Sequence, residues 1–176
     1  MAEKRLSAVT MKGKPLDLYG TEPKVGDKAP DFRLVADDLS VVTLGETPGK
    51  TRLFNVVPSL DTPVCSVQTR RFAKEIEALG PKVAAYTISL DLPFAMKRFC
   101  AEAGIENITN LSDVHDHSFG HNYGVEIIGL PFPLLARAIF VVDSSNTLRH
   151  VEIVPEIAQE PDYEAALTAI NASVNA

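Results

Sequence analysis

Two cysteines, Cys65 and Cys100, are the residues of this 176-residue chain best suited to nucleophilic chemistry. Cys65 follows Thr62 and Pro63, which suit the cap and the first position of a helix. A cysteine in the first helical turn lies near free backbone N–H groups and the positive end of the helix dipole, which favours the thiolate. A cysteine in general is more often a small buried hydrophobic residue than a reactive one. The position of Cys65 in the fold therefore decides which of the two it is.

That place is set by the segment before the helix. Residues 51–57 form an apolar run with β-branched residues, which is typical of a buried central strand. Apolar residues at three- and four-residue spacing then predict a helix over 63–79, ended by a Gly-Pro pair. Open α/β sheets bind ligands at the edge where strands lead into helices. Cys65 is therefore predicted to lie at a ligand-binding edge, where a reactive cysteine is favoured.

The remaining elements alternate between strands and helices. The sequence predicts a hairpin within residues 1–20, strand pairs at 32–35 with 41–44 and 137–143 with 148–154, a strand at 82–89, a loop at 124–135, and helices at 93–103, 119–125 and 162–174. This order predicts an α/β thioredoxin-like fold with a central mixed sheet, flanking helices and an N-terminal β-hairpin extension over 1–20. Residues 1–176 are expected to form a single domain.

Charge and hydropathy exclude several classes of function. The net charge of −6 and the scattered basic residues argue against nucleic acid as a partner. No apolar run is long enough to span a membrane, and the charged N-terminus lacks the apolar core of a signal peptide. We therefore expect a cytoplasmic protein. Because that compartment keeps thiols reduced, the two cysteines are predicted to be either buried packing residues or reactive ones, and not a stabilising disulfide.

The pattern Pro58-x-x-x-Thr62-x-x-Cys65 resembles the active-site signature of the peroxiredoxin family. Further segments are similar to the thiol peroxidase branch of that family, the atypical two-cysteine type. These segments are residues 90–95, 98–100, 136–138 and 160–167, and residues 26–32 resemble peroxiredoxins in general. The resemblance covers nearly the whole chain and implies the thioredoxin-like fold reached above.

The resemblance also implies a role for each matching residue. Cys65 corresponds to the peroxidatic cysteine and Cys100 to the resolving one. Thr62 is implied to hydrogen-bond the thiolate and the peroxide, Arg137 to hold its positive charge over the same site, and Pro58 to shield the sulfur. Arg137, taken alone, is better explained as a surface or structural arginine.

The implied reaction needs no cofactor. A hydroperoxide oxidises Cys65 to a sulfenic acid, which Cys100 converts to an intrachain disulfide, and thioredoxin reduces that disulfide. The resemblance further implies a homodimer built near the active sites. The two cysteines lie 35 positions apart and both fall in predicted helices. Because a disulfide needs close Cα atoms, we expect local unfolding during the cycle.

Other interpretations remain. The apolar segment 124–135 fits a wall for organic hydroperoxides and a dimer contact equally well. A non-catalytic redox sensor would use the same cysteines without an arranged Thr62 and Arg137. A zinc site built on His115, His117 and His121 is disfavoured because no second ligand cluster is visible. A thiol–disulfide oxidoreductase is disfavoured by the absence of a C-x-x-C pair.

Overall fold

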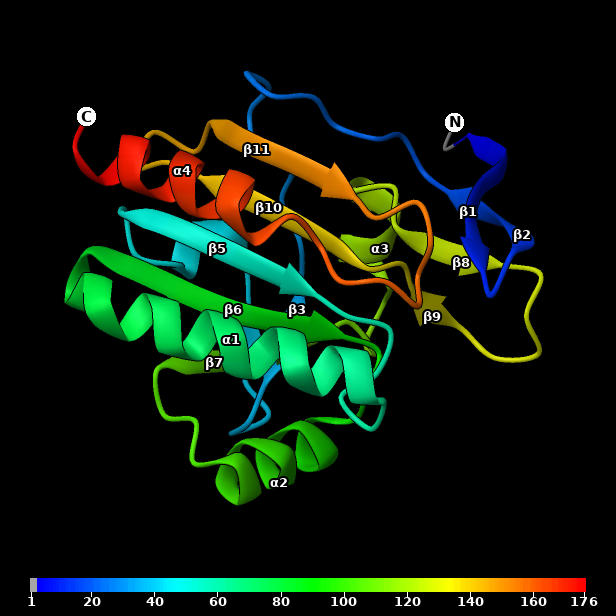
Figure 1. Ribbon diagram of the computed structural model, residues 1–176, viewed down its shortest axis with the longest axis horizontal. Helices are drawn as coiled ribbons and strands as arrows, with labels where there is room; N and C mark the ends of the chain where they lie inside the picture. Colours follow the sequence, from blue (N-terminus) through cyan, green and yellow to red (C-terminus); the bar gives the residue numbers. More distant parts are fainter. Residues whose placement is uncertain (1–2) are drawn as a thin grey trace.

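A seven-stranded mixed sheet forms the centre of the computed structural model, which describes residues 3–176 (Figure 1). Its strand order is β11-β10-β5-β6-β7-β3-β4. Strands β5, β6 and β7 run parallel, whereas β10 pairs antiparallel with β5 and β11, and β3 pairs antiparallel with β7 and β4. The bounds are β3 Leu34–Ala36, β4 Val41–Val42, β5 Thr51–Val56, β6 Val83–Ser89, β7 Ile108–Ser112, β10 Ala138–Val142 and β11 Leu148–Ile153.

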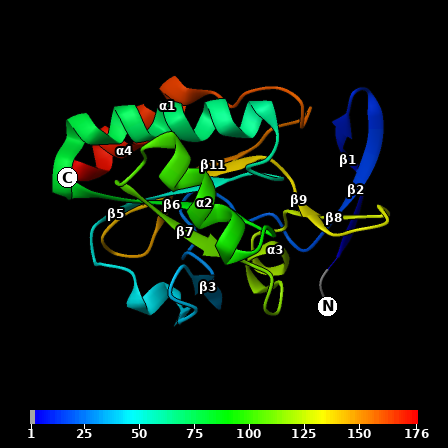
Figure 2. The same ribbon diagram turned by 90° about the horizontal axis from the view of Figure 1, so that it is seen from below.

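Helices cover both faces of this sheet. Figures 1 and 2 show α1 (Pro63–Leu79) and α4 (Tyr163–Val174) side by side on one face, and α3 (Ser118–Asn122) on the other. The alternation of strand side chains explains the two cores. Leu53 packs with residues of α1 and α4, whereas the next residue, Phe54, packs with aromatic residues of the opposite face such as Phe119. Helix α2 (Pro93–Ala103) lies beside β7, and two 3-10 turns cover Leu44–Glu46 and Gly80–Lys82.

A second, four-stranded sheet has the order β1-β2-β8-β9. Its strands are β1 Lys4–Met11, β2 Lys14–Tyr19, β8 Glu126–Ile128 and β9 Leu134–Leu135. The predicted N-terminal hairpin is thus present, with Met1 and Ala2 of the predicted 1–20 extension outside the described residues. The prediction of a loop throughout 124–135 was wrong, because β8 pairs with the outer edge of β2. Strands of two or three residues are too short to leave a periodic signal.

The helices that flank the predicted reactive edge begin and end as expected. Helices α1 and α2 span the predicted ranges, and Gly104 takes the left-handed conformation after α2 with φ 67°. Helix α3 is shorter than predicted, and the buried Asp113 carboxylate accepts the N–H groups of Phe119 and Gly120 at its start. Strand β7 was not predicted, because Asn110 and Ser112 interrupt its apolar pattern.

The parallel strands bring two helix starts together. Strands β5 and β6 end at the same edge of the sheet, and α1 and α2 begin just beyond those ends. Cys65 therefore lies at the edge that the sequence predicted. None of the helices within residues 3–176 has the length and apolar character that crossing a lipid bilayer requires.

Candidate active site

The Cys65 sulfur lies in a small apolar cluster at the start of α1. Cys65 has no solvent-exposed surface and packs with Val57, Leu60 and Met96. Pro63 occupies the first helical position, which places Cys65 in the first turn. The N–H groups of a first helical turn have no partner within the helix, so the turn that carries this thiol offers free backbone donors. Burial alone would make Cys65 an inert packing residue, so its polar neighbours decide its chemistry.

Thr62 is the first of these neighbours. It occupies the N-cap position of α1, as predicted, but its side chain does not cap a helix N–H. Instead its hydroxyl oxygen lies 2.7 Å from Cys65 Sγ and 2.8 Å from the backbone oxygen of Ser59. A hydroxyl has one proton, so it donates either to Ser59 or to the sulfur. A thiolate at Cys65 competes for that proton, whereas a neutral thiol leaves it with Ser59.

Arg137 is the second neighbour and is buried, with 2% of its surface exposed. It precedes β10, and because Ala138 pairs with Val56, Arg137 is level with the end of β5. Its Nη1 donates to Cys65 Sγ at 3.4 Å, and its Nε donates to the backbone oxygen of Ile157 at 2.8 Å. Within the described part of the chain, Arg137 forms no ion pair with a carboxylate. Arg137 is therefore not a surface arginine, and of the two alternatives given for it only the structural one is left.

A buried network that the sequence analysis missed fixes the guanidinium. Arg137 Nη1 also donates to Gln68 Oε1 at 2.8 Å, and Gln68 Nε2 donates to Asn55 Oδ1 at 2.5 Å. Asn55 Nδ2 in turn donates to Thr69 and Thr87. Gln68 lies three residues after Cys65, on the same side of the helix, and this spacing was a signal that could have identified it. Asn55 left no such signal, because a lone amide inside an apolar strand points to no partner.

Asp91 joins the segment before Cys65 to the segment before α2. Its carboxylate accepts the Ser59 hydroxyl at 2.8 Å and the Leu60 N–H at 2.8 Å. It also accepts the Ser89 hydroxyl at 2.9 Å. Asp91 thus holds the β5–α1 loop against the end of β6. Asp91 lies in the segment 90–95 that resembles the thiol peroxidase branch, but its contact with the β5–α1 loop was not predicted.

Cys100 lies in α2 and is buried, with its thiol donating to Asn110 Oδ1 on β7 at 3.4 Å. Burial raises the pKa of the Cys100 thiol above its ordinary value. Both cysteines are free thiols, so the structure does not bring the two sulfur atoms into a bond. Cys100 is therefore held as an unreactive thiol in this conformation.

A cavity of about 430 Å³ lies in front of these groups. Pro58, Thr62 and Arg137 line one side of it. Met11 of β1, together with Phe132 and Leu134 from the segment around β9, lines another. Ile127 instead belongs to the protein core, so only part of the apolar 124–135 segment faces the cavity. Cys65 itself does not line the cavity, but its two polar neighbours, Thr62 and Arg137, do.

A family model described as Redoxin matches residues 24–167. The chain belongs to the redoxin family, in its thiol peroxidase branch. A redoxin relative, the thiol peroxidase of Halalkalibacterium halodurans, is 50% identical over 96% of this chain and 100% of its own length. The thiol peroxidase of Listeria monocytogenes serotype 4b is 51% identical over 93% and 98%. A peroxiredoxin-like protein from Aquifex aeolicus, of known structure, matches with a TM-score of 0.86 and 38% identity over 96% and 98%. The predicted family and thioredoxin-like fold are confirmed.

We predict that Gln68→Leu slows alkylation of this redoxin's Cys65 by iodoacetamide at pH 7 by about two- to threefold, the net effect expected from weaker stabilisation of a thiolate. The variant removes the acceptor that orients Arg137 toward the sulfur. The measurement is made in a Cys100→Ser background, so that Cys65 is the one thiol available for alkylation. Gln159→Leu changes the exposed glutamine and serves as the matched control. Equal rates for both variants would mean that Gln68 only fills space.

Proposed function

We propose that this protein is a thioredoxin-dependent thiol peroxidase in which Cys65 reduces hydroperoxides. The observation that carries the proposal is the contact of the Cys65 sulfur with Thr62 and with Arg137, a buried cation that has no carboxylate partner among residues 3–176. A buried guanidinium needs a nearby anion, and the Cys65 thiolate is the group placed to supply it. Thiol peroxidase relatives of about half-identical sequence support the same activity.

The proposed first step transfers one oxygen atom. The thiolate attacks the terminal oxygen of a hydroperoxide, an S–O bond forms and the O–O bond breaks. Cys65 becomes a sulfenic acid, and the leaving alkoxide takes a proton to give the alcohol, or water when the substrate is hydrogen peroxide. Negative charge moves from sulfur to the leaving oxygen during this step. The donors that hold the thiolate are therefore also placed to receive the developing charge.

Ionisation of a thiol explains only a small part of such reactivity. A thiol with an ordinary pKa of about 8.5 is roughly 3% ionised at pH 7. A pKa near 6 would raise the thiolate fraction roughly thirtyfold, but nucleophilicity would fall roughly tenfold. The net gain is about two- to threefold. Stabilisation of the leaving oxygen by Thr62, Arg137 and the Cys65 N–H must supply the larger effect, as donors in an oxyanion hole do.

We predict that Thr62→Val lowers kcat/KM for hydroperoxides by about 10²- to 10³-fold, the usual effect of removing one such donor. Thr62→Ser keeps the hydroxyl and should stay within about tenfold of the wild type. Arg137→Ala is expected to lower kcat/KM at least as far as Thr62→Val. Stopped-flow measurement of Cys65 oxidation gives these rates. Unchanged kcat/KM in a folded variant would remove that residue from the mechanism.

The second step requires the two cysteines to meet. The Cys100 thiol attacks the Cys65 sulfenic acid, a disulfide forms and water leaves. In the described conformation Cys100 faces Asn110 and the start of α1 is tied to Asp91. We propose that local unfolding of the start of α1 and of the last turns of α2, where Cys100 lies, exposes both sulfurs. A dithiol of the thioredoxin type then reduces the disulfide by thiol–disulfide exchange.

We predict that Cys65→Ser abolishes peroxide consumption in an assay with thioredoxin, thioredoxin reductase and NADPH. Cys100→Ser should consume one equivalent of peroxide per chain and then stop, because the sulfenic acid has no partner. The wild type should complete many turnovers. A wild type limited to one equivalent, with the reductant present, would favour the stoichiometric redox sensor instead of the enzyme.

The cavity supports a preference for organic hydroperoxides. Phe132 and Leu134 give it apolar walls next to Arg137. Phe132 is 56% exposed, so it is also available as a contact in the homodimer that we propose from the family resemblance. Phe132 therefore belongs to both proposals, the substrate wall and the dimer contact, and its replacement separates the two.

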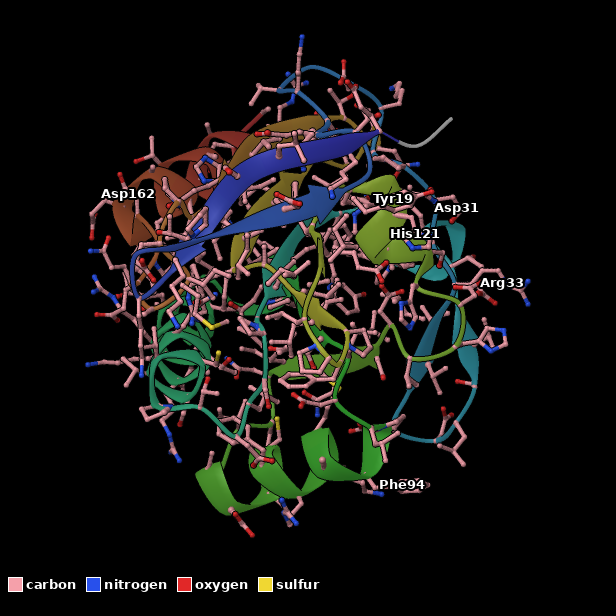
Figure 3. The ribbon with its side chains drawn as sticks, turned by 90° about the vertical axis from the view of Figure 1, so that its right-hand side faces the viewer. Tyr19, Asp31, Arg33, Phe94, His121 and Asp162 are labelled. Atoms are coloured by element: carbon pink, nitrogen blue, oxygen red, sulfur yellow. The ribbon has the colours of Figure 1, made fainter. Side chains whose placement is uncertain are left out.

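We predict that Phe132→Ala lowers kcat/KM for a bulky alkyl hydroperoxide by about 10-fold and leaves that for hydrogen peroxide within about twofold. Phe94→Ala is the matched control, because Phe94 is 66% exposed at the start of α2 and does not line the cavity (Figure 3). Sedimentation equilibrium of the same variants tests the dimer. If Phe132→Ala lowers kcat/KM equally for both peroxides and the homodimer dissociates, Phe132 belongs to the dimer contact.

We place this activity in the cytoplasm, where a thioredoxin system keeps free thiols such as Cys65 and Cys100 reduced. We also propose that residues 1–176 act as one domain. The shared sheet supports this, because the N-terminal strand β2 pairs with β8 from the second half of the chain.

A further inference from the structure

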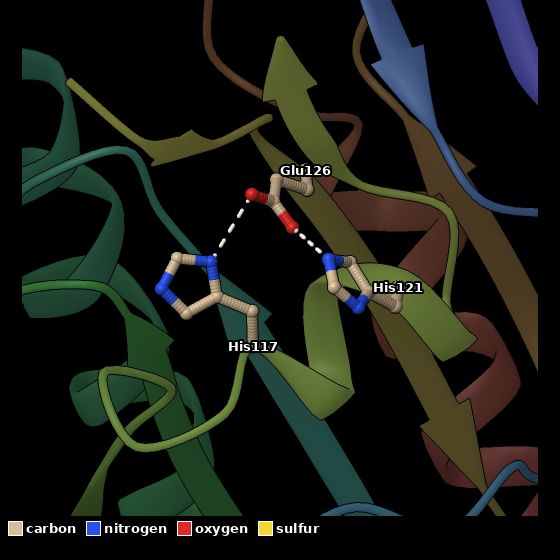
Figure 4. A group of neighbouring side chains, drawn as sticks. All are labelled: His117, His121 and Glu126. Atoms are coloured by element: carbon tan, nitrogen blue, oxygen red, sulfur yellow. Dashed lines mark hydrogen bonds and ion pairs between the residues drawn. The ribbon is translucent and has the colours of Figure 1, made fainter.

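Three side chains that could bind a metal ion meet at α3, and none of them lines the active-site cavity (Figure 4). His117 is the N-cap residue of α3, His121 lies in its last turn, and Glu126 begins β8. In the sequence, the candidates were His115, His117 and His121, with no second ligand cluster visible. The structure leaves His115 out and brings in Glu126, which no sequence pattern had indicated.

The three ligand atoms face one another. His117 Nδ1 lies 3.1 Å from Glu126 Oε1, and His121 Nε2 lies 2.5 Å from Glu126 Oε2. All three residues offer atoms within 4.8 Å of one another. Oε2 is buried and accepts no hydrogen bond of acceptable geometry, so the ring of His121 does not satisfy it. A buried carboxylate oxygen without a hydrogen bond favours a cation as its partner.

Neighbouring groups hold this arrangement in place. His117 has a left-handed backbone with φ 56°, which is uncommon for a residue other than glycine, and its side chain contacts Glu126 of β8. The Tyr19 ring meets the His121 ring edge-on, with centroids 4.9 Å apart. Tyr19 also pairs with Glu126 across β2 and β8. In the part of the chain that the structure describes, Glu126 forms ion pairs with these two histidines and with no lysine or arginine.

We propose that His117 Nδ1, His121 Nε2 and the Glu126 carboxylate bind a zinc ion, with water at a fourth position. Two imidazoles and one carboxylate form a ligand set that zinc uses, whereas calcium and magnesium prefer oxygen ligands alone. Tetrahedral ligands at zinc distances of about 2.0–2.1 Å lie about 3.3 Å apart. The His121 side chain is 40% exposed, so a small rotation of its ring opens the short contact to that spacing.

Zinc binding here exchanges protons for the metal. In the zinc-free protein, a ring nitrogen that donates to the carboxylate carries a proton. The zinc ion takes that position, and each imidazole binds through a deprotonated nitrogen while its other nitrogen keeps a proton. Protons are released to solvent and no atom changes oxidation state. Zinc affinity therefore falls as the pH is lowered.

The test measures zinc binding to the full chain by isothermal titration with zinc chloride in excess magnesium. The reference chain carries Cys65→Ser and Cys100→Ser, because thiolates also bind zinc. We expect one zinc ion per reference chain. Adding His117→Ala or Glu126→Gln should weaken binding at least about tenfold. His115→Ala, which changes a nearby histidine outside the cluster, should bind like the reference.

Thermal unfolding provides a second measurement on the same proteins. A ligand that binds only the folded state raises the melting temperature, so zinc should stabilise the reference chain and the His115→Ala variant. It should not stabilise the His117→Ala or Glu126→Gln variants, although these must show the circular dichroism of a folded chain without zinc. A reference chain that retains no zinc, or a His115→Ala variant that loses as much as His117→Ala, would overturn the proposal.

Discussion

The contact between a buried positive charge and a buried sulfur governs the rest of this site. Arg137 is removed from solvent and its guanidinium is met by a thiol, an amide and a backbone carbonyl. Burying an unpaired charge is costly, and the Cys65 sulfur is the group placed to meet the charge of Arg137. The guanidinium is thereby held against the sulfur that we propose as the nucleophile.

Local sequence signals predicted the frame of this site well. The Thr62-Pro63 start and the Gly104 end fixed the two helices that carry the cysteines, because caps act over a few residues. The apolar run of β5 predicted that Cys65 lies at the edge of the sheet where this strand leads into α1. The family resemblance, and not the spacing of residues, directed attention to Arg137.

Contacts between distant parts of the chain could not be predicted in this way. Asn55 reaches Gln68 and Thr87, and Asp91 reaches Ser59 and Leu60, across separations that no local period reports. Strands β8 and β9 form only because β2 offers an edge. Glu126 could not be predicted as a partner of the two histidines for the same reason, because the pairing of β8 with β2 places it beside them.

Residues from both sheets line the cavity, and the two sheets contribute different kinds of side chain. The edge of the large sheet and the loops beyond it supply Thr62 and Arg137, the two residues that contact the Cys65 sulfur. The small sheet and its connecting segment supply Met11, Phe132 and Leu134. Side chains of the small sheet can therefore vary with substrate size while the reacting groups stay fixed, since no residue of the small sheet hydrogen-bonds the sulfur among those described.

Asp91 makes the opening of the site cooperative. One carboxylate accepts hydrogen bonds from the loop that leads into α1 and from the end of β6, just before α2. Hydrogen bonds to a charged group contribute about 1.5–3 kcal/mol each, so releasing one segment weakens the hold on the other. The loop before α1 and the segment before α2 are thus released together, so the start of α1 and the helix that carries Cys100 loosen in one concerted fluctuation instead of two independent ones.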